Sequence, residues 1–271
     1  MGFYSGVLPS SYLHAHMSYT MSMKKLFLSL LLLLSGLSGL KAEDDKVPFS
    51  KYKPNFITFG DKKDQTLLQF SFKYAVIKNQ NFFIGYTQTS WWNIYNPSSP
   101  FYITHYNPEL FYLWQLDSKV LTSVTFGFYE HKSNGRDGDA SRSMDSSYVK
   151  FTKEIGHFEL SSKFFGMYNL DSGNRDLVQY IGWWNAMIGY KFHLIDHFMY
   201  ESIALGFYAG GVKPDLVGRG GLSADLTFAV PFIKDEFTPM ITFQYFRGYG
   251  VNLFDYDQFQ QNFRAGIVLY R

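Results

Sequence analysis

Short strand-like runs repeat along the sequence from Asn55 onward, and the connections between them alternate between tight and long. The runs are bounded by turn-forming residues, which indicates β-strands. Twelve runs are predicted, at 55–60, 67–76, 80–90, 109–117, 120–131, 145–154, 157–168, 179–192, 198–209, 219–229, 236–247 and 262–270. Tight connections are predicted at 78–80, 117–119, 154–156, 194–197 and 231–235, and mostly longer, polar ones at 91–108, 132–144, 169–178, 210–218 and 248–261. This alternation predicts an all-β fold, a single 12-stranded antiparallel transmembrane β-barrel with its short turns on the periplasmic side.

The composition supports a membrane-embedded barrel. Aromatic residues make up 20% of the chain and charged residues only 18%, and the mean hydropathy is −0.15. A transmembrane barrel has aromatic girdles at both membrane interfaces and needs no long apolar run. A secreted, soluble β-sandwich is the alternative, although its composition would normally be less aromatic. The chain has no cysteine, so it gains nothing from disulfides, and its formal charge of +2 gives no reason to expect a nucleic-acid partner.

The N-terminal segment has the pattern of a secretory signal peptide. Met23 and two lysines precede an apolar run over 26–40, and a small residue, Ala42, stands before an acidic stretch. A membrane anchor is the alternative, but the run is shorter than the roughly 20 residues of a spanning helix. We therefore expect Met23 to be the true start and residues 1–42 to be leader and signal peptide. Residues 43–271 would then form one domain, the barrel.

Residue types found in serine hydrolases gather where the predicted strand 120–131 ends. His131 and Ser133 are two residues apart, so their side chains leave the same face of an extended chain. Asp145 begins the next predicted strand, and in an antiparallel hairpin that position lies about 5 Å from the end of the preceding strand. Ester cleavage by serine needs a hydroxyl, a base and a group that orients the base. The three residues can therefore meet at the long-loop, outer end of the barrel.

The loop between His131 and Asp145 also allows two simpler interpretations. Ser133 to Arg136 is ordinary turn sequence, because Asn-Gly tolerates positive φ. Oxygen-bearing side chains alternate from Asp137 to Asp145 as they do in an EF-hand loop. The EF-hand is excluded because Arg142 replaces its glycine and Tyr148 replaces its bidentate glutamate. The hard oxygens remain compatible with a calcium site of another geometry.

Several motifs resemble the outer-membrane phospholipase A family of Gram-negative bacteria. They occur in the order found in that family, and the resemblance covers essentially the whole predicted barrel. The motifs are Tyr86-Thr-Gln-Thr-Ser-Trp-Trp92, Ser98-Ser-Pro-Phe101, Tyr106-Asn-Pro-Glu-Leu110, His131-Lys-Ser-Asn-Gly-Arg136, Ser141-Arg-Ser143, and Gly248-Tyr-Gly250 with Asp255-Tyr256.

The resemblance implies a role for each residue of the predicted hydrolase site. Ser133 would be the nucleophile, His131 the general base and Asp145 the third member, where the family usually has asparagine. A carboxylate should still orient the imidazole, and it would support the charged form more strongly than an amide does. The backbone N–H of Gly135, together with a water polarised by calcium, would form the oxyanion site.

The resemblance also implies a calcium cofactor and a homodimer. The calcium ligands would be the carbonyl of Arg136, the hydroxyl of Ser141 and, across the homodimer, the carbonyl of Ser98. Gln88 matches a polar residue that the family buries between the two lipid-facing barrel walls. A polar side chain in hydrocarbon is better satisfied by a partner than left alone. Because a lipase surrounded by its substrate must normally be inactive, we expect dimer formation to switch it on.

The orientation of the site is open from periodicity alone. Val124, Phe126 and Phe128 form the more apolar set of their strand, and their parity is opposite to that of His131 and Ser133. Because an ester in the leaflet cannot reach the lumen, we expect His131 and Ser133 to face lipid.

The expected function is that of a carboxylic ester hydrolase in the outer membrane. It would release fatty acids from phospholipids in the outer leaflet, with phospholipase A1, phospholipase A2 and lysophospholipase activity. Calcium would be required, and the homodimer would be the active form. The alternative is a non-enzymatic porin or adhesin-like barrel, in which the grouping of His131, Ser133 and Asp145 would be accidental.

Overall fold

The computed structural model describes residues 49–60, 66–77, 81–116, 118–192, 200–211, 215–229 and 239–269. The leader predicted at 1–42 lies outside the described residues, and so do the tight connections predicted at 78–80, 194–197 and 231–235. Among the described residues, no helix is long and apolar enough to cross a membrane.

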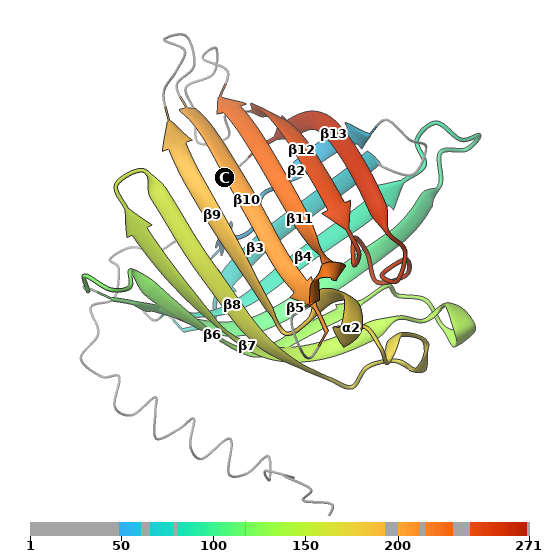
Figure 1. Cartoon of the computed structure of the whole chain (residues 1–271), viewed down its shortest axis with the longest axis horizontal. Helices are drawn as coiled ribbons and strands as arrows, with labels where there is room; N and C mark the ends of the chain where they lie inside the picture. Colours follow the sequence, from blue (N-terminus) through green and yellow to red (C-terminus); the bar gives the residue numbers. More distant parts are fainter. Residues whose placement is uncertain are drawn as a thin grey trace, which may run out of the picture. The chain divides into compact units, whose positions relative to one another are not determined.

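The strands of the described chain form one antiparallel sheet that closes on itself (Figure 1). They are β1 (Phe49–Lys51), β2 (Phe56–Gly60), β3 (Thr66–Ala75), β4 (Phe82–Trp92), β5 (Phe101–Gln115), β6 (Ser123–Ser133), β7 (Ser143–Ile155), β8 (Phe158–Tyr168), β9 (Trp184–Phe192), β10 (Tyr200–Gly210), β11 (Asp215–Ala229), β12 (Met240–Gly248) and β13 (Gln260–Val268). From β2 to β13 each strand pairs with the next, and β13 pairs back with β2. The ring contains twelve strands, so the predicted 12-stranded barrel is confirmed.

The short strand β1 lies on the same edge of β3 as β2 does. β1 pairs with residues 72–74 of β3, and β2 pairs with residues 67–69. Between them the chain leaves the wall. The hydroxyl of Tyr52 donates to Oε2 of Glu109 at 2.9 Å, and the ammonium of Lys53 bonds to the same carboxylate. β1 and β2 therefore occupy one strand position in the barrel wall. They are separated by the residues whose side chains, those of Tyr52 and Lys53, reach Glu109.

The strand β5 is longer than predicted. It begins at Phe101, so the connection predicted over 91–108 is confined to 93–100. The added residues include His105 and Asn107, which are buried in the barrel. Inward-facing polar side chains resemble a loop in the sequence, and this explains the error.

Two other boundaries also differ from the prediction. A short helix, α2 (Val178–Ile181), occupies the start of the strand predicted at 179–192, and β9 begins only at Trp184. β11 begins at Asp215, so the predicted connection over 210–218 is shorter in the structure. Neither change alters the strand order.

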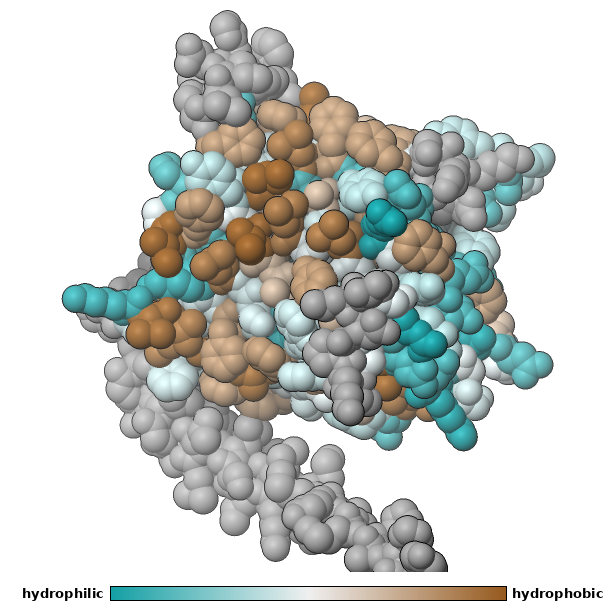
Figure 2. Space-filling model, viewed as in Figure 1, coloured by the Kyte–Doolittle hydropathy of each residue, from teal (hydrophilic) through white to brown (hydrophobic). Residues whose placement is uncertain are grey.

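The outer wall of the barrel is apolar and its interior is mostly polar. Exposed hydrophobic side chains include Phe59, Phe70, Ile84, Tyr106, Tyr129, Phe151, Leu160, Ile188, Leu205, Leu222, Ile241 and Phe263. Buried polar side chains include Thr58, Ser71, Thr87, Asn107, Glu109, Glu130, Ser146, Thr227 and Thr242. Figure 2 shows hydrophobic side chains gathered over the strands in front, with hydrophilic ones toward the end where α2 lies. This distribution suits a wall of strands surrounded by hydrocarbon.

A β-bulge interrupts β6. Leu110 of β5 pairs with Tyr129, whereas the next residue of β5, Phe111, pairs with Gly127. Phe128 is therefore an extra residue in β6. Because side chains alternate between the two faces of a strand, one extra residue reverses the parity of everything beyond it.

The bulge decides which way the predicted site faces. Phe126, before the bulge, lies on the outer face, and so do His131 and Ser133 beyond it. Glu130 turns inward, where the ammonium of Lys163 lies 2.6 Å from its carboxylate. The opposite parities seen in the sequence are therefore compatible with one apolar outer wall.

Candidate active site

The predicted base and its orienting group lie opposite each other in the sheet. The register of β6 with β7 pairs His131 directly with Asp145. Nδ1 of His131 lies 2.7 Å from Oδ1 of Asp145. The side chain of Asp145 is 11% exposed and that of His131 34%, so the carboxylate is shielded while the imidazole can reach a substrate. Because an ionised carboxylate only accepts hydrogen bonds, Nδ1 carries the proton and Nε2 can act as a base.

The backbone of His131 is held by a side chain of the neighbouring strand. In β5 and β6, Tyr106 pairs with Ser133 and Glu109 with Glu130, so the register between these pairs brings Pro108 opposite His131. Proline has no N–H to donate to the ladder. Instead, Nδ2 of Asn107 donates to the carbonyl of His131 at 2.8 Å. The side chain of Asn107 thus supplies the hydrogen bond that Pro108 cannot donate to the backbone of His131, the predicted base.

Ser133 ends β6, and a tight loop follows it. The side chain of Asn134 closes this loop, because Nδ2 donates to the carbonyl of Ala140 at 2.8 Å and Oδ1 accepts from the N–H of Arg142 at 3.1 Å. Gly135 has a φ of 65°, and its N–H donates to Oγ of Ser133 at 3.1 Å. Within the described part of the chain, the structure gives no hydrogen bond between the Ser133 hydroxyl and His131. Such bonds are often long in free enzymes and tighten when substrate binds.

Two residues that the sequence did not indicate also contact Asp145. The hydroxyl of Tyr129 donates to Oδ1 at 3.1 Å, and its ring lies 6.4 Å from that of His131 with an interplanar angle of 10°. Nδ2 of Asn169 donates to Oδ2 at 2.9 Å. Tyr129 could have been found, because it stands two residues before His131 on one strand face. Asn169 gives no such signal, since only the pairing of β7 with β8 brings it to Asp145.

The predicted calcium ligands within the loop offer hard oxygen atoms. The hydroxyl of Ser141 donates to Oδ2 of Asp171 at 2.8 Å, which leaves its lone pairs free for a cation. The N–H of Gly173 and this hydroxyl hold the pKa of Asp171 below its ordinary value, because both donate to its charged form. Among the described residues, no three His, Cys, Asp or Glu side chains form a metal cluster. Hydroxyl and backbone carbonyl oxygens, such as that of Arg136, are nevertheless ligands that calcium accepts, so this donor set fits the ion.

Ser98, the other predicted ligand residue, lies in the turn between β4 and β5. Ser98 and Ser99 both have positive φ, 63° and 40°, which is uncommon for serine. Nε1 of Trp92 donates to the carbonyl of Ser99 at 2.7 Å, and the Ser99 hydroxyl donates to the carbonyl of Ile94 at 2.9 Å. These bonds hold the turn without using the carbonyl of Ser98, which belongs to an exposed residue.

Gln88 stands on the outer wall in the same cross-strand row as Ser133, with Tyr106 of β5 between them. Its Oε1 accepts a hydrogen bond of 3.1 Å from the hydroxyl of Tyr86. Its cross-strand partners are Phe70 and Tyr106, which are 53% and 41% exposed. An amide therefore lies among exposed aromatic side chains, and its place in a dimer interface stays a prediction.

The loop between β12 and β13 packs into the same end of the barrel. The N–H of Leu253 donates to Nε2 of His105 at 3.0 Å, and both residues are 2% exposed. The ring of Phe254 lies under the guanidinium groups of Arg136 and Arg142, at 5.2 and 5.4 Å. This loop therefore links the mouth of the barrel to the loop that follows Ser133. The sequence predicted a long connection here, with motifs at Gly248–Gly250 and Asp255–Tyr256, but assigned it no contact with the site.

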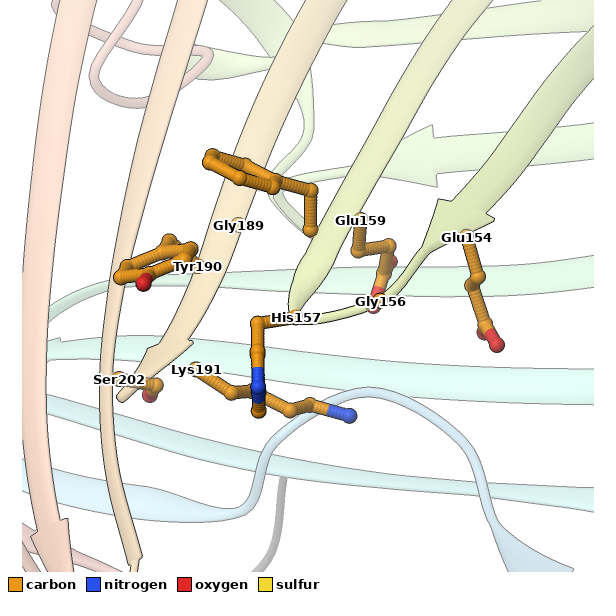
Figure 3. A pocket seen from close by; sticks show the side chains of 9 residues that line it. Glu154, Gly156, His157, Glu159, Gly189, Tyr190, Lys191 and Ser202 are labelled. Atoms are coloured by element: carbon orange, nitrogen blue, oxygen red, sulfur yellow. The ribbon is translucent and has the colours of Figure 1, made fainter. Parts of the chain in front are cut away.

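A small cavity lies at the opposite end of the hairpin of β7 and β8 (Figure 3). It is about 110 Å³ in volume and is lined by Glu154, Gly156, His157, Phe158, Glu159, Gly189, Tyr190, Lys191 and Ser202. It contains none of the predicted site residues. The turn between β7 and β8, beside which this cavity lies, is roughly 30 Å from Asp145 along β7 at about 3.3 Å per residue.

Comparisons with known proteins agree with this fold. The model of the phospholipase A1 family matches residues 38–269. A phospholipase A1 of Escherichia coli is 32% identical over 219 residues, which cover 77% of this chain and 70% of that protein. A phospholipase A1 of Salmonella typhimurium is 31% identical over 219 residues, with the same coverage of each chain.

Two solved structures superpose on most of the chain. The Salmonella typhi outer membrane phospholipase dimer with bound calcium has a TM-score of 0.70 at 25% identity and covers 84% of this chain and 94% of its own. Outer membrane phospholipase A from Escherichia coli has a TM-score of 0.66 at 24% identity and supports the fold alone.

A closed antiparallel barrel with an apolar outer wall defines an outer-membrane β-barrel protein. The chain belongs to the phospholipase A1 family, whose members are ester hydrolases.

Proposed function

We propose that this protein is a calcium-dependent serine acyl hydrolase that releases fatty acids from phospholipids of the outer leaflet, with phospholipase A1, phospholipase A2 and lysophospholipase activity. The contact of 2.7 Å between His131 and Asp145 carries the proposal, because Ser133 follows on the same outward face. Membership of the phospholipase A1 family supports the reaction class. The outward orientation supports the substrate class, since a lipid ester can reach the site laterally from the membrane.

In the proposed mechanism Oγ of Ser133 attacks the ester carbonyl carbon while Nε2 of His131 takes the hydroxyl proton. His131 then gives this proton to the leaving oxygen of the lysophospholipid as the ester C–O bond breaks, and the acyl group stays on Ser133. Water attacks the acyl group with His131 again as base, which frees the fatty acid and restores the hydroxyl. Asp145 keeps the proton on Nδ1 and stabilises the imidazolium that forms in each step.

The N–H of Gly135 is suited to stabilise the negative charge that develops on the carbonyl oxygen. It lies 3.1 Å from Oγ of Ser133, next to the carbon that Oγ would attack. When bound, calcium supplies positive charge that polarises a water at this oxygen. The carbonyl of Arg136 and the hydroxyl of Ser141 would hold the ion, and a second copy would add its Ser98 carbonyl.

The dimer would be the active form because the calcium site is completed only between two copies. Gln88 supports a contact through the apolar walls, since its amide lies among exposed aromatic side chains. A dimer of the Salmonella typhi relative has calcium bound, which supports the same arrangement here. The monomer would then be inactive although surrounded by substrate.

Fatty-acid release by the detergent-solubilised protein tests this function directly. We expect release from phospholipid micelles that depends on added calcium and stops with a chelator. A porin or adhesin-like barrel would release none at any calcium concentration, and that result would reject the proposal.

A further inference from the structure

We propose that Asn169 is a positioning residue that, together with Tyr129, fixes the carboxylate of Asp145 and through it the imidazole of His131. The inference deepens the proposed function and rests on it. Asn169 touches neither Ser133 nor His131 in the hydrogen bonds of the structure, so any effect on the reaction must pass through Asp145.

The two oxygens of Asp145 have separate donors. Oδ1 lies 2.7 Å from Nδ1 of His131 and accepts from the Tyr129 hydroxyl at 3.1 Å, while Oδ2 accepts from Nδ2 of Asn169 at 2.9 Å. The side chain of Asp145 is only 11% exposed, so water has little access to replace a lost donor. Because an ionised carboxylate only accepts, the NH₂ group of Asn169 must face it. The donors on both oxygens together hinder rotation of the carboxylate.

The backbone holds Asn169 firmly in this position. It follows Tyr168, the residue of β8 that pairs with Asp145 in β7. Its φ is 50°, a left-handed conformation that asparagine tolerates better than most residues. Two residues on, the N–H of Asp171 donates to the carbonyl of Ser143 at 3.0 Å, which ties the outgoing chain to the start of β7. The backbone is therefore held both before and after Asn169, and this places its side-chain amide beside the carboxylate of Asp145.

Exchanging the two side-chain groups tests the contact most sharply. In N169D two carboxylates would face each other, and we expect the rate of hydrolysis to fall by roughly a hundredfold. In D145N/N169D the new amide at position 145 can donate to the new carboxylate at 169 while its oxygen accepts from His131. We expect this double variant to recover most of the loss. N169A should lose roughly tenfold, because a buried carboxylate oxygen then lacks its donor.

A pH profile separates positioning from a merely structural role. Negative charge near His131 favours the imidazolium, which cannot act as a base. N169D has one more negative charge than the native protein, D145N one fewer, and the double variant the same number. The acidic limb should therefore lie at the lowest pH in D145N, at the highest in N169D, and between them in the native protein and the double variant.

Tyr129 and Tyr168 provide a matched pair of variants should the exchange prevent folding. The Tyr129 hydroxyl binds Asp145, whereas the Tyr168 hydroxyl lies 3.3 Å from Oγ of Ser147. We expect Tyr129→Phe to slow the reaction roughly threefold to tenfold and Tyr168→Phe to leave it unchanged. The rate of labelling of Ser133 by a fluorophosphonate should follow the same order, measured at saturating calcium on barrels that show heat-modifiable migration.

The labelling rate keeps this inference separate from the proposed function. A native protein that labels at Ser133 but releases no fatty acid would reject the substrate and leave the positioning role measurable. N169D labelling as fast as native protein, or a double variant no faster than N169D, would overturn the role of Asn169. Equal rates for Tyr129→Phe and Tyr168→Phe would show that the Tyr129 hydroxyl does not help to position Asp145.

Discussion

Nδ2 of Asn107 donates to the backbone carbonyl of His131 at 2.8 Å and takes the place of the N–H that Pro108 lacks. A side chain of the interior thus fixes the strand at the proposed base. Asn107→Ala should lower stability by about 1–2 kcal/mol, because it leaves that carbonyl without a donor, and should slow hydrolysis several-fold. Unfolding in urea and fatty-acid release measure the two effects.

A second substitution checks the reason for that loss. Pro108→Ala restores a backbone N–H opposite His131, so the double variant N107A/P108A should recover most of the stability lost by N107A. If P108A has no effect in the N107A background, the amide of Asn107 does not act as a substitute for the missing ladder bond.

Asp145→Asn should keep activity within about tenfold of the native protein, since an amide oxygen can also accept from Nδ1–H of His131. Asn169 can rotate its own amide to present oxygen to the new NH₂ group. Removing the carboxylate disfavours the imidazolium, so the imidazole gives up its proton at lower pH and activity should extend to lower pH. The pH–rate profile measures this, and a loss as severe as that of Ser133→Ala would assign Asp145 another role.

Ser141→Ala should raise the calcium concentration needed for activity and for dimer formation together. It removes one oxygen from a cation that needs several, and a ligand bound mainly by the dimer must favour the dimer. Ser172→Ala is a nearby control, because its hydroxyl also bonds to Asp171 but is not a proposed ligand. Crosslinking beside turnover over a calcium titration measures both quantities. Independent responses would contradict a shared site.

Gln88→Leu should weaken the dimer by about 1 kcal/mol, because one polar contact between protein segments in a membrane contributes about that much. The proposed catalytic groups should not change. High calcium should partly restore the dimer by mass action. Ile84→Leu on the same strand is an apolar control. A Gln88→Leu protein that dimerises like the native one would place the interface elsewhere.

The strand count could be predicted because turn residues separate nearly all of the strands. The start of β5 could not, because His105 and Asn107 point into the interior and look like loop residues in the sequence. The bulge at Phe128 could not be found either. The opposite parities of Phe126 and His131 are its mark in the sequence, but they do not show that a bulge causes them or where it lies. Only the pairing of Leu110 and Phe111 with β6 reveals both.

The proposed site was predictable where its members are close in sequence. His131, Ser133 and Gly135 lie within five residues, and Asp145 starts the next strand, so local spacing and one hairpin bring them together. Asn169 and Asp171 reach the site through the next hairpin, of β7 and β8. Their positions depend on the register of that hairpin and on the left-handed turn at Asn169, neither of which sequence spacing reveals.

Replacement of Ser133 tests the central claim most directly. In Ser133→Ala, measured as calcium-dependent fatty-acid release from phospholipid micelles, we expect activity to fall by about a thousandfold or more. The barrel should still show heat-modifiable migration, because one hydroxyl at the rim contributes little to the ladder. Appreciable turnover by this folded variant would contradict the assignment of Ser133 as the nucleophile.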